Sequence, residues 1–574
     1  MRKVVTWNST TIAFNQVWAD EYGLPAGHWR QTVTTGTGVE TNYFDAFWRP
    51  IYAERWDNND RANTQSIVRH QYDSDGRSTF ESYPVRTQGE IANGVYQQYD
   101  ALGRLVATVA DSERGQLRTS VWCNPSAFQK VQTNARGFAT TYYYQAFDQP
   151  SEDAITGIAA PEGVWVGIDR DLFGKTLAIT RSGNGKSLAR RYVYDGYQRL
   201  CKTIEAETGA TVQAYDGANN VAWRASGLNL PATDACDQGS VPGAQKMSFA
   251  YDELNRLKTT TYGDNSPAIE RTYTLDGQLR TIASDGALWT YDYNKRQLNW
   301  KETLAYGGRT YTVLRGYDAN GAVSQLSYPL DNLTLYYSPN AFGQPSQVGG
   351  FAQGIRYHPN GAIKEFTYGN GIRHELLQNM RGLPERTTDA VSESYVYDAN
   401  GNPEQITDHF LSSASRSMTY DGLDRLTTAT APGLWGNAAY GYDALDNLTS
   451  SSIGSGQNAR NLIHAFNPGN NRLDSVSGGP AGFNFAYAYD LQGNITQRGT
   501  QRYRFDIGNR LRSAEGRATY AYDGHGRRVS SVGNDQSNTV QIYTQEGKLL
   551  YSGPAAGGGA KYIYLNNHQI AEVK

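Results

Sequence analysis

A short phrase recurs along the chain, and it limits what the chain can fold into. Its clearest copies read YVYDANGNPEQI from Tyr395, MTYDGLDRLTTA from Met418 and YGYDALDNLTSS from Tyr440. The aspartates of these copies lie 23 and 22 residues apart. A fixed phrase at such a spacing predicts a repeat architecture, in which each unit contacts mainly its neighbours.

The phrase occurs in many further copies. Downstream copies begin at His464, Tyr487, Tyr503 and Tyr520, upstream copies at Tyr99, Tyr194, Tyr251 and Tyr317, and weaker copies at Tyr43, Tyr143 and Tyr273. None of them has helical periodicity. The 41 tyrosines and 60 glycines of the 574 residues suit half-buried strands and tight turns, respectively.

The letters of one unit predict a β-hairpin. Tyr395 and Tyr397 point to the same sheet face, so we expect their rings to stack side by side. Asp398 opens a turn, and its carboxylate can accept hydrogen bonds from the backbone N–H groups of that turn. Gly401 lies at the position where such a turn needs a positive φ. In the copy that ends in Arg-Leu, Arg425 either stacks on a neighbouring tyrosine or pairs with the aspartate of the next unit.

These expectations define the structural positions of the repeat, which are Tyr99, Asp100, Gly103, Arg104, Tyr194, Asp195, Tyr251, Asp252, Tyr397, Asp398, Gly401, Tyr420, Asp421, Tyr442, Asp443, Tyr489, Asp490, Tyr522 and Asp523. About 25 hairpins with strands ~4.8 Å apart would form roughly 240 Å of sheet. Because open twisted sheets rarely exceed about ten strands without curling, this sheet must wind. The predicted fold is therefore all-β: one long antiparallel sheet of tandem hairpins, wound into a spiral that is either a narrow solenoid or a hollow shell.

The phrase Y-x-Y-D-x-x-G-R-L at this spacing resembles the YD repeat of the RHS family, which includes bacterial polymorphic toxins, Tc-toxin C components and the teneurin shell. The resemblance covers roughly residues 40–574. It implies a hollow shell which, in bacteria, commonly holds a toxic C-terminal segment. We expect residues 1–40 to be a degenerate cap, 41–560 to be the repeats with a surface insertion near 205–250, and 561–574 to lead into the RHS-associated core.

The end of the sequence sharpens the resemblance. Tyr562-Ile563-Tyr564-Leu565 resembles the family's lead-in to its core, but the D-P-x-G-type self-cleavage motif and the toxin that follow in the family are absent. The expected function is thus an encapsulating shell without its cargo. The implied partner is a C-terminal toxin segment or other polypeptide cargo, with secretion-system components, a chaperone and surface glycans as further candidates.

Charge, hydropathy and cysteine content indicate which other kinds of protein and site the sequence does not support. The net charge of −3 with interspersed acids and bases gives no support for nucleic-acid binding. No apolar run approaches the ~20 residues that span a bilayer, and no signal peptide is evident, so we expect export to the cell surface or medium by a specialised system. The three cysteines, Cys123, Cys201 and Cys236, are odd in number and far apart, which argues against a disulfide framework and a zinc site.

Several motifs imitate catalytic or binding sites. The pairs Asp421/Asp424 and Asp443/Asp446 recur with the repeat, so turn capping explains them better than acid–base chemistry. Residues 181–187 end like a phosphate-binding loop but lack its first glycine, and a hairpin turn is the better interpretation. Residues 398–402 begin like a calcium loop but lack its glycine and its final glutamate.

We therefore predict no enzyme activity and no catalytic, cofactor or metal site. The alternative function is cell-surface adhesion or carbohydrate binding, because exposed tyrosine rows can stack on sugar rings. A glycosidase is the third hypothesis, and it would need two carboxylates outside the repeat positions in one cleft.

Overall fold

The computed structural model describes residues 7–124, 128–145, 153–330, 332–454, 459–480 and 483–574. Its described part contains fifty β-strands and a single α-helix, α1 (Arg61–Thr64). No helix of this part is long and apolar enough to cross a membrane. The expected all-β class is confirmed.

The strands divide into two sheets, of 27 and 23 strands. The first sheet comprises β1 (Thr10–Val17), β2 (His28–Thr35), β3 (Gly38–Phe44), β4 (Pro50–Asp57), β5 (Ser66–Tyr72), β6 (Ser78–Ser82), β7 (Gly94–Tyr99), β8 (Leu105–Ser112), β9 (Gly115–Asn124), β10 (Gln129–Thr133), β11 (Ala139–Tyr144), β12 (Ile155–Ala160), β13 (Val164–Arg170), β14 (Thr176–Gly183), β15 (Lys186–Tyr194), β16 (Leu200–Glu205), β17 (Gly209–Tyr215), β18 (Val221–Leu228), β19 (Met247–Tyr251), β20 (Leu257–Tyr262), β21 (Ile269–Tyr273), β22 (Leu279–Ser284), β23 (Ala287–Tyr293), β24 (Asn299–Tyr306), β25 (Arg309–Tyr317), β26 (Val323–Ser327) and β27 (Thr334–Tyr336).

The second sheet comprises β28 (Gln347–Val348), β29 (Ala352–Tyr357), β30 (Ile363–Tyr368), β31 (Arg373–Gln378), β32 (Pro384–Thr388), β33 (Ser392–Tyr397), β34 (Pro403–Asp408), β35 (Arg416–Tyr420), β36 (Leu426–Ala431), β37 (Gly436–Tyr442), β38 (Leu448–Ile453), β39 (Arg460–Phe466), β40 (Leu473–Ser477), β41 (Phe485–Tyr489), β42 (Ile495–Arg498), β43 (Gln501–Phe505), β44 (Leu511–Ala514), β45 (Ala518–Tyr522), β46 (Arg528–Gly533), β47 (Asn538–Tyr543), β48 (Leu549–Pro554), β49 (Ala560–Leu565) and β50 (His568–Val573).

Nearly every strand pairs with the strand before it and the strand after it. The pairings are antiparallel, as between β23 and β24 and between β35 and β36. The register shifts at the end of most hairpins that a five-residue turn closes, for example between Thr419 and Tyr420, so a bulge precedes the aspartate of the turn. Bulges strengthen the local twist of a sheet, and regularly spaced bulges help such a strip to coil.

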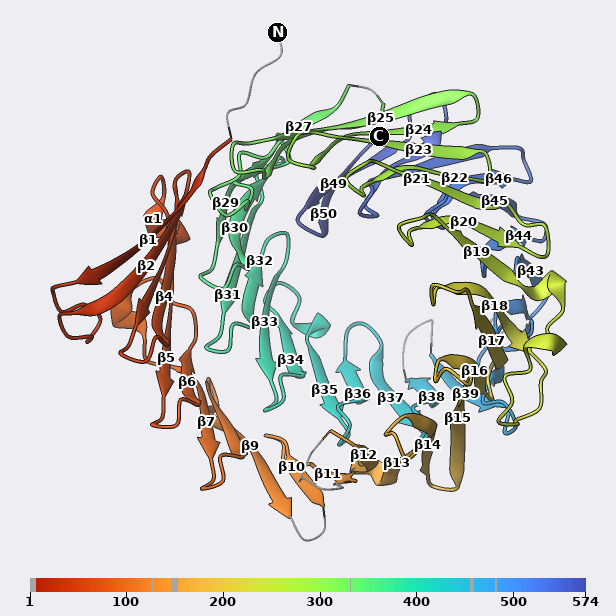
Figure 1. Cartoon of the computed structure of the whole chain (residues 1–574), viewed down its shortest axis with the longest axis horizontal. Coiled ribbons are helices and arrows are strands. Elements are labelled where there is room, and N and C mark those ends of the chain that lie inside the picture. The colour runs from red at the N-terminus through yellow and green to blue at the C-terminus, as the bar shows by residue number, and fades with distance from the viewer. Residues whose placement is uncertain (1–6, 125–127, 146–152, 331, 455–458, 481–482) are drawn as a thin grey trace.

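The strip winds through two revolutions (Figure 1). In the view of Figure 1 the first sheet forms one ring and the second sheet a further ring against it, and no described strand crosses the middle. Hydrogen bonds between successive revolutions join residues 312 apart in the sequence near the start and 234 apart near the end, as in Asn8–Asn320, Asp57–Ala341, Arg181–Ala444, Trp289–Asp523 and Tyr328–Tyr562. One revolution therefore takes about 230 to 310 residues.

The surface area agrees with a wall rather than a compact globule. The chain exposes 29874 Å², whereas a compact monomer of its mass would expose about 20,000 Å². The excess arises because both faces of most of the sheet border solvent. The predicted spiral is thus present, and the surface area favours the hollow shell over a narrow solenoid filled with side chains.

The two largest buried clusters lie where the two windings meet. One joins Trp289, Leu304 and Tyr311 of the first winding to Val529 and Ile542 of the second. Two smaller clusters, around Val212 and around Tyr52, lie within the first winding alone. Because the two largest clusters draw on both windings, winding the strip on itself supplies much of the core that a single layer of hairpins lacks.

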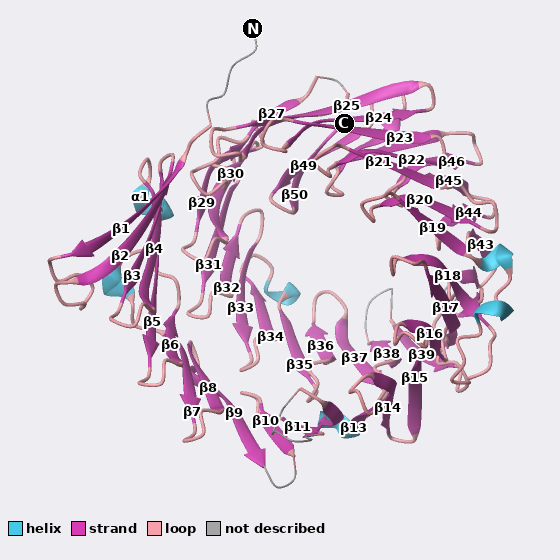
Figure 2. Cartoon of the chain, viewed as in Figure 1, coloured by secondary structure: helices cyan, strands magenta, loops and turns pink. Residues whose placement is uncertain are grey.

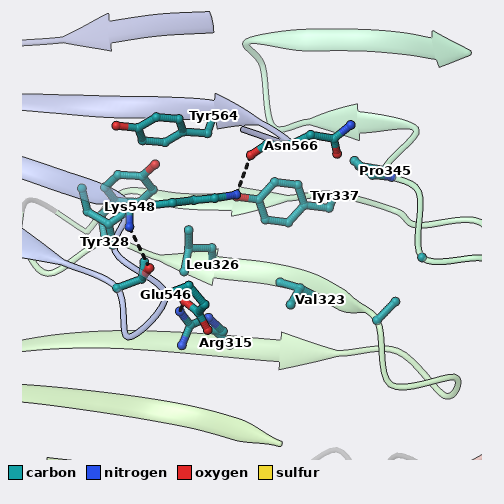
Figure 3. Close-up of a pocket in the computed structure, with 14 residues that line it drawn as sticks. Arg315, Val323, Leu326, Tyr328, Tyr337, Pro345, Glu546, Lys548, Tyr564 and Asn566 are labelled. Carbon is teal, nitrogen blue, oxygen red and sulfur yellow. Dashed lines mark hydrogen bonds and ion pairs between the residues drawn. The ribbon is translucent and has the colours of Figure 1, made fainter. Parts of the chain in front are cut away.

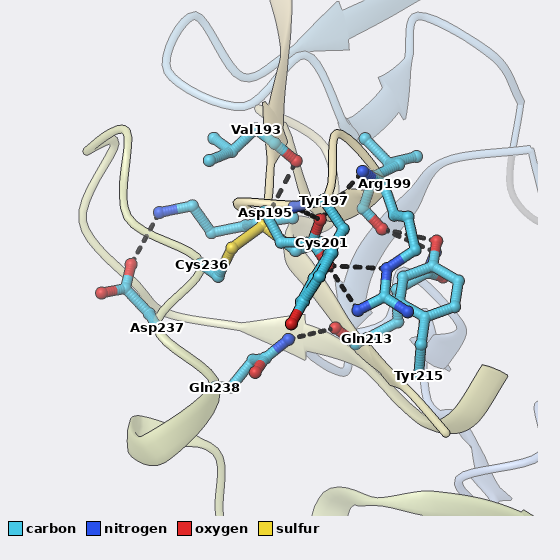
Figure 4. Close-up of a disulfide and its surroundings, with 12 residues drawn as sticks. Val193, Asp195, Tyr197, Arg199, Cys201, Gln213, Tyr215, Cys236, Asp237 and Gln238 are labelled. Carbon is cyan, nitrogen blue, oxygen red and sulfur yellow. Dashed lines mark hydrogen bonds and ion pairs between the residues drawn. A yellow bond between two sulfur atoms is a disulfide. The ribbon is translucent and has the colours of Figure 1, made fainter. Parts of the chain in front are cut away.

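The prediction against a disulfide was wrong. Cys201, on β16, and Cys236 form a disulfide with Cα atoms 5.4 Å apart (Figure 4). The fully buried amine of Lys202 also reaches the same loop, where it pairs with Asp237 at 2.6 Å. Cys201 and Cys236 are 35 residues apart in the sequence, and on the sequence alone this separation argues against a bond. They meet because the loop after β18 folds back onto β16, the strand that precedes β17.

The expected insertion near 205–250 contains both regular and irregular structure. β17 and β18 are regular strands within it, joined by a repeat turn at Asp216. Only residues 229–246 are irregular, and their short helical turns lie on the outside of the ring beside β17 and β18 (Figure 2). The expected cap, residues 1–40, already contains β1 and β2. The proposed domain boundaries remain predictions.

Candidate functional site

The repeat turn has one geometry throughout the chain, and Asp421 shows it. Its Oδ1 accepts the backbone N–H groups of Leu423 and Arg425, both at 2.9 Å. Its Oδ2 accepts the Nε–H of Arg425 at 2.7 Å. The N–H of Asp424, the residue with positive φ, donates to the carbonyl of Asp421. One carboxylate thus ties down the whole turn.

The other predicted aspartates lie in the same place. Their Oδ1 atoms accept backbone N–H groups two or four residues on, at 2.8 to 3.0 Å, at Asp100, Asp195, Asp252, Asp398, Asp443, Asp490 and Asp523. The backbone N–H of Arg104 and its guanidinium lower the pKa of Asp100 below its ordinary value. Gly103 and Gly401 occupy the fourth turn position, with φ of 79° and 97°.

The arginine that ends the turn joins one unit to the next. Arg425 stacks on Tyr442, with its guanidinium carbon 4.8 Å from the ring centroid. It also donates to the main-chain carbonyl of Asp443 at 3.0 Å. Its guanidinium also pairs with the carboxylate of Asp446 in the next unit at 2.9 Å. Both expected partners are therefore used, in addition to the carboxylate of its own turn. The same stacking recurs in Arg77–Tyr99, Arg199–Tyr215, Arg256–Tyr273 and Arg472–Tyr489.

The tyrosine before each aspartate binds back to the preceding unit. Its hydroxyl donates to the carbonyl of the residue that opens the preceding returning strand, at 2.8 to 3.0 Å, for Tyr99, Tyr194, Tyr251, Tyr420, Tyr442, Tyr489 and Tyr522. Tyr397 instead stacks on Tyr395 as expected, with ring centroids 6.5 Å apart, and burial raises its pKa to about 12. The tyrosine rows are hence occupied by contacts within the wall.

Sequence reasoning missed several repeat turns. Asp73, Asp171 and Asp216 make the same carboxylate contacts, and Asn294 and Asn340 replace the aspartate with an amide. Such turns could have been found from Asp or Asn followed three residues later by Gly, Asn or Gln, the residues that tolerate a positive φ at that position. The weak copy at Tyr143 runs into residues outside the described ones.

The three motifs that imitate active sites have structural roles in the wall. Asp424 and Asp446 do not cap turns as predicted; they hold the positive-φ position and pair with Arg136 and Arg181 of the other winding. Residues 181–187 form the β14–β15 hairpin expected for them. Asp398 pairs with Arg136 at 3.1 Å. Among the described residues no cluster of three or more His, Cys, Asp or Glu could hold a metal ion.

The seam between the windings is where distant residues converge. The Trp289 indole N–H donates to Asp523 at 2.9 Å, and the Tyr291 hydroxyl lies 2.7 Å from His525 Nε2. Burial lowers the pKa of His525. The fully buried Glu302 binds Arg315 and the backbone N–H of Gln545. These polar contacts fix the register of one winding on the other.

A pocket of about 380 Å³ lies in this seam near the end of the second winding (Figure 3). Leu326, Tyr328 and Tyr337 line it from the first winding, and Lys548 and Tyr564 from the second. The Lys548 amine donates to the carbonyl of Asn566, and burial lowers its pKa. The pocket is mainly apolar, and no pair of carboxylates lines it.

No family model matches the sequence, and no curated protein matches it. Solved structures do match its fold. A crystal structure of TcdB2-TccC3 without its hypervariable C-terminal region is 14% identical, with a TM-score of 0.71 over 94% of this chain. TcdB2-TccC3 itself gives 0.64 over 98%, and the Tc holotoxin pore of Photorhabdus luminescens 0.62 over 95%, both at 14% identity.

This chain spans about a third of the length of those chains, covering 32% of the first, 34% of the second and 32% of the third. Its fold is the fold of the Tc toxin shell chain, as the YD/RHS resemblance implied.

Proposed function

We propose that this chain is part of the wall of an RHS-type toxin shell that encloses a polypeptide cargo and performs no chemistry of its own. The observation that carries the proposal is the winding itself: two revolutions of one sheet, joined along a buried seam, around a middle that no described strand crosses. A matched solved structure is named for the absence of a hypervariable C-terminal region, which supports a cargo attached after the shell. Export by a specialised system belongs to the same proposal.

The position of the last strands bears on which side of the wall an attached cargo would lie. β49 and β50 lie inside the outline of the first winding in Figure 1. The turn between β49 and β50 points toward the middle of the ring, and the C-terminus lies at the wall beside β25 in the same view. We infer that a polypeptide attached after Lys574 starts at the wall, next to the enclosed space. By contrast, the loop of residues 229–246 lies outside it (Figure 2).

The test attaches one protease-sensitive reporter peptide in two places. In one protein it follows Lys574, and in the other it is inserted after Gly239, in the outer loop. We expect the reporter after Lys574 to be cleaved at least about ten times more slowly than the reporter in the outer loop. The reason is that the protease reaches an enclosed peptide only when the wall opens locally. Equal cleavage rates at both positions, with both proteins folded, would rule out enclosure.

Carbohydrate binding is the second candidate, and a different surface favours it. Phe14, Trp29, Phe44 and Trp48 form an aromatic cluster on one face of the first strands, with Trp29 and Trp48 stacked at 5.5 Å. Phe14 is 50% and Trp48 56% exposed. Aromatic faces with a polar surrounding suit sugar rings. Binding to a glycan panel that Trp48→Ala abolishes would support adhesion, whereas binding lost only on unfolding, or no binding at all, would reject it.

A further inference from the structure

The two edges of the wound sheet differ. One edge, here called the long-turn rim, carries most of the five-residue repeat turns, such as those opened by Asp100 and Asp421. The opposite edge, here called the short-turn rim, carries the tighter connections, such as the one that joins β14 to β15. Each winding therefore has one rim of each kind.

Inside the chain, these rims bind each other. The long-turn rim of the second winding seats on the short-turn rim of the first, so the Arg181 guanidinium donates to the carbonyl of Ala444 at 2.8 Å. A Cβ on Gly183 would come 2.7 Å from that of Ala444. The Trp289–Asp523 contact belongs to the same seam. This closeness requires small residues at the contact.

Among the described residues, the long-turn rim of the first winding has no such cover before its last two turns, where Asn320 and Ala341 contact Asn8 and Asp57. Leu102 and Leu254, two residues after their turn aspartates, are 76% and 68% exposed. Leu423 and Leu445 occupy the same repeat position in the second winding and are only partly exposed there. Likewise Ala444 is 2% exposed whereas Ala101, in the equivalent position, is exposed. The first rim thus keeps the apolar residues of the seam without a partner.

Apolar side chains recur along this uncovered rim: Phe47 is 77%, Phe173 81% and Tyr197 83% exposed. The short-turn rim of the second winding is uncovered too, and it exposes Phe410 at 68%, Leu411 at 55% and Leu434 at 49%. Large exposed apolar patches of this kind mark interaction surfaces. One chain consequently carries both halves of the contact that it already makes within itself.

We propose that copies of this chain associate head to tail, with the short-turn rim of the second winding of one copy seated on the long-turn rim of the first winding of the next. The contact is heterologous, so it does not close on itself and permits growth beyond a dimer. It repeats, between copies, the seam between the two windings. The inference depends on the winding and not on the cargo.

Sedimentation at increasing concentration tests it with two variants. Leu102→Asp with Leu254→Asp alters the long-turn rim, and Phe410→Asp with Leu411→Asp alters the short-turn rim. All four side chains are exposed, so the fold should survive. We expect the unaltered protein to associate as its concentration rises, and each variant alone to associate at least about tenfold more weakly, since each contact needs one rim of each kind.

A mixture of the two variants is the decisive sample. The long-turn rim of one variant and the short-turn rim of the other are intact, so the mixture should form dimers and nothing larger. Ile463→Asp, at a 58% exposed position on β39 away from both rims, is the matched control and should associate like the unaltered protein. A protein that stays monomeric at all concentrations, or a mixture without dimers, would overturn the inference, and slow cleavage of the reporter after Lys574 would still support the shell.

Discussion

The guanidinium carbon of Arg425 lies 4.8 Å from the ring centroid of Tyr442, the tyrosine of the next repeat. The same arginine binds the carboxylate of its own turn, and Tyr442 donates its hydroxyl to Leu426, the residue after Arg425. Two neighbouring units are therefore connected in both directions by side chains of the repeat phrase. Stability in such a wall arises from contacts between neighbours more than from any single hairpin.

Replacement of the turn aspartate should be costly when it removes the acceptor. Asp421→Ala leaves the N–H groups of Leu423 and Arg425 without their partner, and we expect it to destabilise the region by about 2–4 kcal/mol. Asp421→Asn keeps one acceptor oxygen and should cost about half as much, because Asn294 and Asn340 already serve in this position. Hydrogen exchange of residues 416–431 measures both, and equal effects would contradict the assigned role.

A substitution in the seam should also destabilise the chain. Trp289, fully buried, packs between the windings and donates to Asp523. We expect Trp289→Phe to cost about 1–3 kcal/mol, because it leaves the buried carboxylate short of one donor. Leu288→Ala, on the neighbouring residue with 41% exposure, is the control and should change the urea midpoint little. A Trp289→Phe midpoint equal to the control would mean that the hydrogen bond contributes nothing.

Acid should loosen the seam through His525. Burial lowers the folded-state pKa of this imidazole, and the charges that face it are Asp523, Arg527 and Arg271. The unfolded chain therefore binds the proton more readily than the folded chain. The contribution of neutral His525 to folded-state stability is complete above the unfolded-state pKa, about 6.5, and is lost as the pH falls below it. Unfolding midpoints measured between about pH 7.5 and 5.5 should fall with pH, and His525→Gln should flatten that slope. An unchanged slope in the variant would assign the pH dependence to other groups.

Reduction of the disulfide should release the outer loop. The bond between Cys201 and Cys236 closes a 35-residue separation, and the chain-entropy estimate for such a loop is about 4 kcal/mol. We expect a reductant, or Cys236→Ser, to increase hydrogen exchange in residues 229–246 while the strands far from them keep their protection. Cys123→Ser is the control. Loss of protection throughout the chain would show that the bond supports the whole winding.

The sequence by itself determined the local unit. The roles of Asp398, Gly401 and Arg425 could be predicted from the phrase because a turn with a fixed hydrogen-bond pattern is specified within five residues. The need for winding also followed from the number of strands, since a long open sheet cannot stay flat. What the phrase could not show was a turn in which Asn replaces Asp, as at Asn340.

Only the tertiary structure decided which residues meet across the windings. Trp289 and Asp523 are 234 residues apart, and Cys201 pairs with Cys236 through a loop that folds backwards. Leu102 and Leu423 occupy the same position of the repeat turn, yet Leu102 is exposed and Leu423 is half-buried, because burial here depends on the winding that lies beside the turn. The repeat determines the structure of the strip of hairpins, whereas the number of residues in one revolution determines which residues meet across the windings. Small changes of twist, accumulated over many strands, fix that number.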